Sequence, residues 1–220
     1  MTPTRTPPPS PPPVRPPLQR RTAAAWARVL DCGVEILEES GYEGLTIAAV
    51  CQRADVAPPA IYARVDTKED LFLAVYEHGI ARVRTTEAAL ETGDWDQLSP
   101  ARVVERAVRT VLDQFRTHHR FLRSVVLLSS RHEEVRQRGS YYAEALRDRF
   151  VARVAPVMVG RGARTRAAAA FDVVFASGVF HTAYGDDFLH ATSWQRQVVA
   201  MQQAYLLTEA APPPSTKRTH

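Results

Sequence analysis

The sequence has few of the residues that mark several protein classes. It contains two cysteines, Cys32 and Cys51, among 220 residues, so a disulfide-stapled scaffold is excluded and a reducing compartment is favoured. No apolar run approaches the roughly 18 residues of a membrane-spanning helix, and the first residues lack the apolar stretch of a signal peptide. Ten glycines, without strand-like alternation between hairpin turns, argue against a β fold. We therefore expect a cytoplasmic, helical protein that contacts no membrane.

Patterns typical of catalysis and metal binding are also missing. The segment 132–136 (HEEVR) lacks the second histidine of a zinc-binding helix. His118 and His119 are adjacent, so a helix would point them about 100° apart, which is poor for chelation. The segment 160–162 (GRG) lacks the rest of a dinucleotide-binding fingerprint, and no nucleophile elbow is present. We therefore expect no enzyme, no metal and no cofactor.

Charge is distributed unevenly along the chain. Residues 1–28 contain five arginines and no acid, whereas residues 29–80 contain three basic residues against ten acids. Residues 81–220 are basic again, with 20 basic and 14 acidic residues. The acidic middle segment counts against an extended basic surface for nucleic acid, although an arginine-rich arm precedes it.

The chain divides into two tails and two helical domains. Residues 1–19 include nine prolines, which remove amide donors and fix φ, so we expect an extended, disordered tail. Such a tail could serve as an SH3-type ligand, but a solvated tail is favoured. Residues 211–220 predict a second disordered tail. Between them we expect domains at residues 20–66 and 67–210.

Apolar residues spaced by three and four predict an all-α fold of about nine helices. The expected ranges are about 22–40, 46–53, 57–65, 68–92, 100–116, 119–129, 140–158, 164–184 and 193–207. Gly41 predicts a left-handed end to the first helix. Thr46 is a typical N-cap, and Pro58 lies in a first turn where a missing amide costs little. Thr67 with Asp70 predicts a capping box.

The two short helices at 46–53 and 57–65 are joined by a three-residue turn, Ala54–Val56. This is the unit that places a recognition helix in the major groove of DNA. Ile47, Val50, Val56 and Ile61 would hold its helices at a fixed angle. Many helical pairs share this pattern without binding DNA, so the neighbouring sequence matters.

The neighbouring sequence, over about residues 22–80, resembles the TetR/AcrR family of bacterial regulators. The best-matching elements are Gly41-Tyr42 followed by Thr46, and Ile61-Tyr62 followed by Lys68-Glu69 and Leu71. The resemblance implies an N-terminal three-helix helix-turn-helix domain and a C-terminal helical domain for ligand binding and dimerisation. It also implies a DNA-binding transcriptional repressor that a small hydrophobic effector releases from a palindromic operator.

The resemblance assigns DNA contacts to particular residues. They are Arg20, Arg21, Thr46, Ala57, Pro58, Pro59, Tyr62, Ala63, Arg64 and Lys68. Thr46, Tyr62 and Lys68 would bind phosphates, and the N-terminal arginines would contact phosphates or the minor groove. The residues also have structural interpretations: Thr46 as a cap alone, Tyr62 as a packing residue, Lys68 as a solvated side chain and the arginines as part of a mobile tail.

The sequence departs from the family pattern at three positions. Asp55 replaces a usual glycine, Ala57 replaces a usual Ser or Thr cap, and Val65 replaces a usual phenylalanine. The recognition helix is poor in hydrogen-bond donors, and only Arg64 could make a bidentate contact to guanine. We therefore expect specificity to rest on thymine-methyl contacts and on DNA shape.

For the C-terminal domain the resemblance implies a homodimer and an effector pocket. The expected dimer residues lie on the last two helices: Phe171, Val174, Gly178, Trp194, Val198, Met201 and Tyr205. The expected pocket residues are Phe115, Phe121, Arg123, Val125, Tyr141, Tyr142, Phe150, Phe171, Phe175 and His181. Ordinary core or surface roles remain the alternative for each pocket residue. The alternative for the whole chain is a protein-interaction module derived from a helix-turn-helix, with weak or no DNA binding.

Overall fold

The computed structural model describes residues 5–16, 20–185 and 192–208, without the side chains of Arg20 and Arg21, and the regular elements in these ranges are helical. The α-helices are α1 (Arg20–Gly44), α2 (Ile47–Ala54), α3 (Pro58–Tyr62), α4 (Lys68–Glu87), α5 (Pro100–Thr117), α6 (His119–Ser129), α7 (Glu133–Val154), α8 (Ala163–Tyr184) and α9 (Thr192–Leu207). Single 3₁₀ turns follow α4 and α7, at Ala88–Leu90 and Ala155–Val157. The predicted all-α fold of about nine helices is confirmed for the described residues. The predicted C-terminal tail, 211–220, lies outside them.

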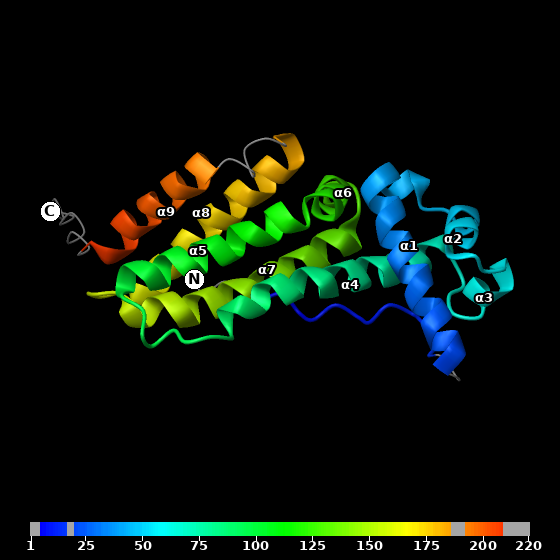
Figure 1. Ribbon diagram of the computed structural model, residues 1–220, viewed down its shortest axis with the longest axis horizontal. Helices are drawn as coiled ribbons and strands as arrows, with labels where there is room; N and C mark the ends of the chain where they lie inside the picture. The colour runs from blue at the N-terminus through cyan, green and yellow to red at the C-terminus, as the bar shows by residue number, and fades with distance from the viewer. Residues whose placement is uncertain (1–4, 17–19, 186–191, 209–220) are drawn as a thin grey trace, which may run out of the picture.

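The molecule is elongated, with α1, α2 and α3 gathered at one end (Figure 1). Helices α5, α7, α8 and α9 form a bundle at the other end, and α4 runs from the first group along the bundle (Figure 1). Helix α1 packs against both α4 and α6, and Ser124 Oγ on α6 donates to the carbonyl of Leu37 on α1, at 2.6 Å. The helix-turn-helix is therefore seated directly on the helices of the C-terminal domain.

Local sequence signals place the first three helices as expected. Thr46 caps α2, and its side-chain oxygen accepts from the Ala49 amide at 3.1 Å. Asp55 ends α2 in the left-handed conformation, with φ 52° and ψ 56°. Pro58 and Pro59 open α3, and Thr67 with Asp70 forms the predicted capping box at the start of α4. Local capping and turn residues thus set where α2 begins and ends and where α3 and α4 begin.

Some predicted helix ends were wrong. At Gly41 the backbone has φ 63° and ψ −168°, which breaks the helix without the left-handed ψ that was expected, and the last helical residues extend to Gly44. Helix α3 ends at Tyr62, because Ala63 and Arg64 continue as a turn bonded back to Pro59 and Ile61. Helix α7 covers Glu133–Val154, not 140–158, because Gly139 lies inside it and does not start it. Ser99 occupies the N-cap of α5 but makes no side-chain cap bond.

Helix α8 is long and apolar enough, by length and composition alone, to cross a membrane. Its position in the bundle accounts for that composition. Phe171 and Val174 are buried against the neighbouring helices, since α8 packs against α5, α7 and α9. We therefore assign α8 as a core helix of the bundle.

The proline-rich N-terminal segment is extended, as expected, but residues 5–16 are docked on the protein and do not form a free tail. They contact α7 through Thr6 and Ser10 and the turn after α3 through Arg15. Val14 packs against the hydrophobic core. The expectation of a solvated tail is corrected for these twelve residues, which we call the strap.

Candidate functional site: a nucleic-acid interface and an apolar cavity

The outer face of α3 is exposed and almost entirely apolar. Ala57, Pro58, Pro59 and Ala63 are exposed, and Tyr62 is 50% exposed. Ala57 at the N-cap makes no side-chain cap bond. The two prolines have no amide hydrogen, so this helix start offers fewer backbone donors to a phosphate than an ordinary one. The Tyr62 hydroxyl is the polar group that α3 presents on this face.

Thr46 can combine the two roles considered for it. Its hydroxyl oxygen accepts from the Ala49 amide, and the side chain is exposed. A hydroxyl can accept and donate at the same time, so its hydrogen remains able to donate to a phosphate while the oxygen caps α2.

The three basic side chains of residues 29–80 are all engaged within the protein. Arg53 forms an ion pair with Glu39, at 2.6 Å. Lys68 Nζ lies 4.3 Å from the centroid of the Tyr42 ring. Arg64 is only 8% exposed, and its Nη1 donates to the carbonyl of Arg15 at 3.0 Å. This end of the molecule therefore presents little positive charge from residues 29–80.

The expectation that Arg64 reads a base directly is contradicted in this arrangement. Arg64 follows α3 and does not lie within it, and its guanidinium faces the strap. The sequence reasoning failed here because the partner, Arg15, lies 49 residues away in the chain. Arg20 and Arg21 begin α1, but their side chains lie outside the described residues.

Tyr42 is an organising residue that the sequence analysis did not single out. Its hydroxyl donates to Glu69 Oε2 at 2.8 Å, and its ring meets Phe72 edge-on, with centroids 4.9 Å apart. Burial and the bond to Glu69 raise the pKa of Tyr42 to about 12. The other Glu69 oxygen lies 2.8 Å from Nε2 of His132, which precedes α7. One carboxylate thus joins the end of α1 to α4 and α7, and the Tyr42 ring holds Lys68.

Comparison with known families fits this geometry. Residues 29–75 match the family of bacterial regulatory proteins named tetR. Over these residues the chain is similar to the tetR family. The match runs from Val29 in α1 through α2 and α3 to the first part of α4, so the resemblance seen in the sequence is confirmed over the helix-turn-helix.

Solved structures extend the likeness to the whole tetR-family fold. A transcriptional regulator from Rhodococcus sp. RHA1 is 18% identical with a TM-score of 0.64, over 82% of this chain and 94% of that one. GusR of Salmonella enterica is 12% identical with a TM-score of 0.66, over 86% and 98%. A TetR regulator from Haloarcula marismortui is 16% identical with a TM-score of 0.65, over 84% and 97%. A comparison with curated protein sequences finds no match.

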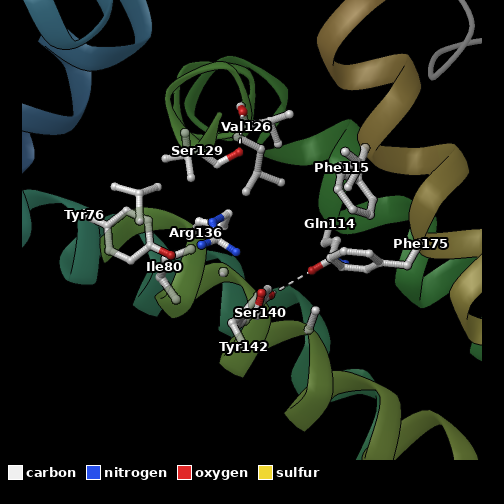
Figure 2. A pocket seen from close by; sticks show the side chains of 16 residues that line it. Tyr76, Ile80, Gln114, Phe115, Val126, Ser129, Arg136, Ser140, Tyr142 and Phe175 are labelled. Carbon is white, nitrogen blue, oxygen red and sulfur yellow. Dashed lines mark hydrogen bonds between the residues drawn. The ribbon is translucent and has the colours of Figure 1, made fainter. Parts of the chain in front are cut away.

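The C-terminal helical domain contains a partly open cavity of about 250 Å³. Phe115 and Phe175 lie on one side of it, Tyr76 and Ile80 on the other, and Val126 on α6 closes it from above (Figure 2). The walls come from α4, α5, α6, α7 and α8. The volume is slightly below the range of about 300–1,000 Å³ that is typical of ligand pockets, which suits a compact ligand.

The structure brings together part of the predicted pocket. Phe115, Val125, Tyr142 and Phe175 line the cavity, whereas six other expected residues do not: Phe121, Arg123, Tyr141, Phe150, Phe171 and His181. The Phe121 ring packs on the backbone at Gly79, where a Cβ would lie 2.2 Å from it. Phe150 and Phe171 pack on each other in the core, and His181 lies against Trp194. Tyr141 faces the strap instead.

One buried amide distinguishes the cavity from a purely apolar core. Gln114 is 1% exposed and lines the cavity. Its Oε1 accepts from the Tyr142 hydroxyl at 2.8 Å (Figure 2), while its Nε2 has no partner among the described residues. An unpaired buried donor costs free energy until an acceptor reaches it. Arg136 also borders the cavity, with its side chain 61% exposed and paired to Glu133.

The predicted dimer surface requires correction. Phe171, Val174 and Val198 are buried within this chain, Gly178 lies under the Phe115 ring, and Trp194 packs against the core. Of the expected residues, Met201 and Tyr205 are exposed, at 59% and 48%. They share the outside of α8 and α9 with three exposed apolar residues: Val173, Phe180 and Tyr184. The sequence spacing identified an apolar stripe but not the side of the helix that faces outward.

Within the described residues, no group of three or more His, Cys, Asp or Glu side chains is placed to hold a metal ion.

Proposed function

We propose that the chain is a cytoplasmic transcriptional repressor. It binds a palindromic operator as a homodimer and is released when a small apolar effector enters the cavity of the C-terminal domain. The observation that carries this proposal is the capped helix-turn-helix, of the tetR family, packed directly on helices that line a cavity with a free amide donor.

For DNA binding, the exposed alanines and prolines of α3 would contact thymine methyl groups. The hydroxyls of Thr46 and Tyr62, with the amides at the start of α2, would fix the helix on the phosphates. Footprinting on the intergenic DNA beside the gene tests this, and we expect a protected palindrome. Tyr62→Phe should weaken binding about three- to tenfold through the loss of one hydrogen bond, whereas Thr85→Val, which removes an exposed hydroxyl from α4, should not. Equal affinities for both variants and the wild type would remove Tyr62 from the interface.

For dimerisation, the exposed apolar face of α8 and α9 would meet its copy across a two-fold axis. Sedimentation velocity at micromolar concentration should then show a dimer. Phe180→Asp places a charge on that face and should give a folded monomer. Val159→Asp, at an equally exposed apolar residue beyond α7, is the matched control and should stay dimeric. A wild type that sediments as a monomer would contradict the dimer.

For the effector, the cavity favours a compact apolar molecule with a hydrogen-bond acceptor for the Gln114 amide. A thermal-shift series of aromatic ketones against hydrocarbons of the same shape tests this. We expect the ketones to stabilise the protein more, and we expect the difference to disappear in Gln114→Leu. Hydrocarbons that bind as well as ketones would remove the role of Gln114.

Release would follow from the packing of the cavity walls. Helices α4 and α6 both line the cavity and both contact α1. An effector that fits better when these helices are displaced would shift the population away from the DNA-binding arrangement. The expected result is a DNA affinity that falls as a stabilising ketone is added.

A second function is favoured by one observation: the basic side chains of residues 29–80 are engaged internally. The chain would then be a protein-interaction module with weak DNA binding. Salt separates the two functions, because a DNA binder loses affinity with a log–log slope of about −0.9 for each neutralised phosphate. A slope near zero would favour the module.

A further inference from the structure

The strap, residues 5–16, crosses from the bundle to the helix-turn-helix. It runs extended beneath α4 toward the lower end of α1 (Figure 1). Thr6, Pro9 and Pro12 are partly buried, whereas the residues between them and Pro13 are exposed. A repeat of three is the period of a polyproline II helix. Residues 6–12 therefore follow the exposure pattern of such a helix, and a bond from the Val14 amide to the Pro12 carbonyl, at 2.8 Å, turns the chain after them.

A groove between α4 and α7 lies along this segment. Tyr76, Ile80, Tyr141 and Tyr142 line it on the bundle side, and Pro8, Pro9, Pro11 and Pro12 of the strap line it from the other side. Aromatic-lined grooves are the general means of recognising proline-rich segments, because the extended helix is preformed and loses little entropy on docking. A groove lined by aromatic rings that faces a row of prolines is typical of a peptide-binding site.

A buried arginine adds polar recognition to the groove. The side chain of Arg138 is 3% exposed, and its Nη2 donates to the carbonyl of Ser10 at 2.7 Å. Glu77 and Glu134 pair with the same guanidinium and balance its charge. Proline has no amide to donate, so carbonyl oxygens are the hydrogen-bonding groups that a polyproline segment offers. Arg138 is therefore a donor placed where such a segment needs one.

Both ends of the strap are fastened. At the start, the Thr6 amide donates to Glu144 at 3.0 Å, and Arg5 pairs with Asp148 at 3.3 Å. At the end, the Arg15 amide donates to the carbonyl of Arg64 at 2.9 Å. The Arg15 guanidinium also donates to the Tyr62 carbonyl and to Asp66. The strap thus bonds to the backbone directly after the recognition helix.

We infer that the groove between α4 and α7 is a polyproline-binding site along which the strap of the same chain docks, and that docking holds Arg64 away from DNA. In the docked state Arg64 donates to the Arg15 carbonyl and is nearly buried. Release of the strap frees a guanidinium beside Ala63, next to a helix face that offers few donors. Strap docking and DNA binding then compete for Arg64. This second part rests on the proposed DNA-binding function, whereas the occupancy of the groove does not.

Occupancy is tested in the full chain with two proline pairs. The double variant Pro9→Gly/Pro12→Gly removes two groove-facing rings. The control, Pro7→Gly/Pro13→Gly, removes two exposed rings and makes the backbone more flexible by the same number of proline substitutions. We expect the first pair to speed amide hydrogen exchange at Thr6 and Arg15 by about tenfold or more, and the control pair by less than about threefold. Wild-type amides that exchange as fast as an unstructured peptide would overturn the docking. Protection that falls on dilution would also overturn it, since the groove would then hold the strap of a second copy.

The role of Arg64 is tested on the footprinted intergenic duplex at constant salt. The Pro9/Pro12 variant should bind about fivefold or more tightly than the wild type, and the control pair should not. Adding Arg64→Ala should abolish that gain, which a double-mutant cycle measures. Faster exchange without tighter binding would overturn the competition. No binding by any form would refute the proposed function, while the exchange data would still decide the occupancy of the groove.

Discussion

The two domains keep their polar side chains in different places. In the helix-turn-helix and at its junction with α4, hydroxyl and carboxyl groups lie at the surface and cap the starts of helices, as Thr46, Thr67 and Asp70 do. In the C-terminal domain, Glu87 and Gln114 are 0% and 1% exposed, and each has a polar atom without a partner among the described residues. The first domain is specified by short sequence signals. The second stores free energy in buried groups that a proton or a ligand can satisfy.

This difference between the domains predicts that a single substitution lowers the free energy of unfolding more in the bundle than in the helix-turn-helix. It also predicts that the stability of the bundle depends on pH and on Cβ atoms added at glycines. The caps of the helix-turn-helix should lose stability only when a hydroxyl is removed. Four experiments test these differences, in order of decreasing effect.

The largest effect is expected on α9, where the inner and outer faces differ. Val198→Asp buries a carboxylate at a 6% exposed position and should lower the free energy of unfolding by about 3–5 kcal/mol. Met201→Asp, three residues later on the exposed face, should cost the subunit less than about 0.5 kcal/mol. Urea unfolding at several protein concentrations measures both, since any dimer-linked loss depends on concentration. Equal losses that are independent of concentration would show that Met201 is also part of the core.

The next effect is pH dependence from Glu87 on α4. Burial raises the pKa of Glu87 to about 7 from 4.5, and the guanidinium of Arg149 only partly opposes it. Between these pH values the folded state keeps a proton that the unfolded state has lost. Stability therefore falls as pH rises through this window, by up to about 3 kcal/mol.

The control for this prediction is Glu87→Gln, which cannot titrate. Urea unfolding from pH 5 to pH 8 should show a shallower decline in the variant than in the wild type. Parallel pH profiles would show that Glu87 does not titrate in this range.

A smaller effect is expected from two glycines within helices of the bundle. At Gly178 an added Cβ would lie 2.4 Å from the Phe115 ring, so Gly178→Ala should cost about 1–3 kcal/mol. Gly139 has no atom within 4 Å of that position, so Gly139→Ala should stabilise its helix by about 0.5–1 kcal/mol. Thermal unfolding measures the two opposite signs. A stabilising Gly178→Ala would contradict the close packing of α8 on α5.

The smallest effect is expected at the cap of the helix-turn-helix. Thr46→Ala removes the acceptor of the Ala49 amide and should cost about 1 kcal/mol. Thr46→Ser keeps the hydroxyl and should stay close to the wild type in both stability and DNA affinity. If alanine is tolerated as well as serine in unfolding but weakens DNA binding, the hydroxyl acts on phosphate and not as a cap.

The same difference between domains explains how much the sequence could predict. Thr46, Asp55, Pro58 and Thr67 act on residues within one helical turn, so their roles follow from local rules and agree with the structure. The start of α7 did not follow: the expected helix began at residue 140, whereas α7 begins at Glu133. Helix packing, which is not local, carries α7 through Gly139.

The functional surfaces of the bundle depend on contacts that sequence spacing cannot assign. Helix α8 is apolar on two sides, with Val174 inside and Phe180 outside, so the period of the helix does not tell core from interface. The cavity includes Tyr76 and Ile80, which the sequence placed only in the helix leading from the helix-turn-helix. The burial of Arg64 depends on Arg15, in a segment whose composition predicted no fixed contacts.

Tyr76, Ile80 and Tyr142 border both the cavity and the groove that holds the strap, so the two sites share one wall. Thermodynamic linkage makes any coupling across this wall reciprocal. The factor by which a cavity ligand changes strap docking is the factor by which the docked strap changes the affinity for that ligand. A chain that lacks the N-terminal residues would then bind an effector with a different affinity from the intact protein. Under the proposed function, the proline-rich segment would belong to the ligand-binding equilibrium as well as to the fold.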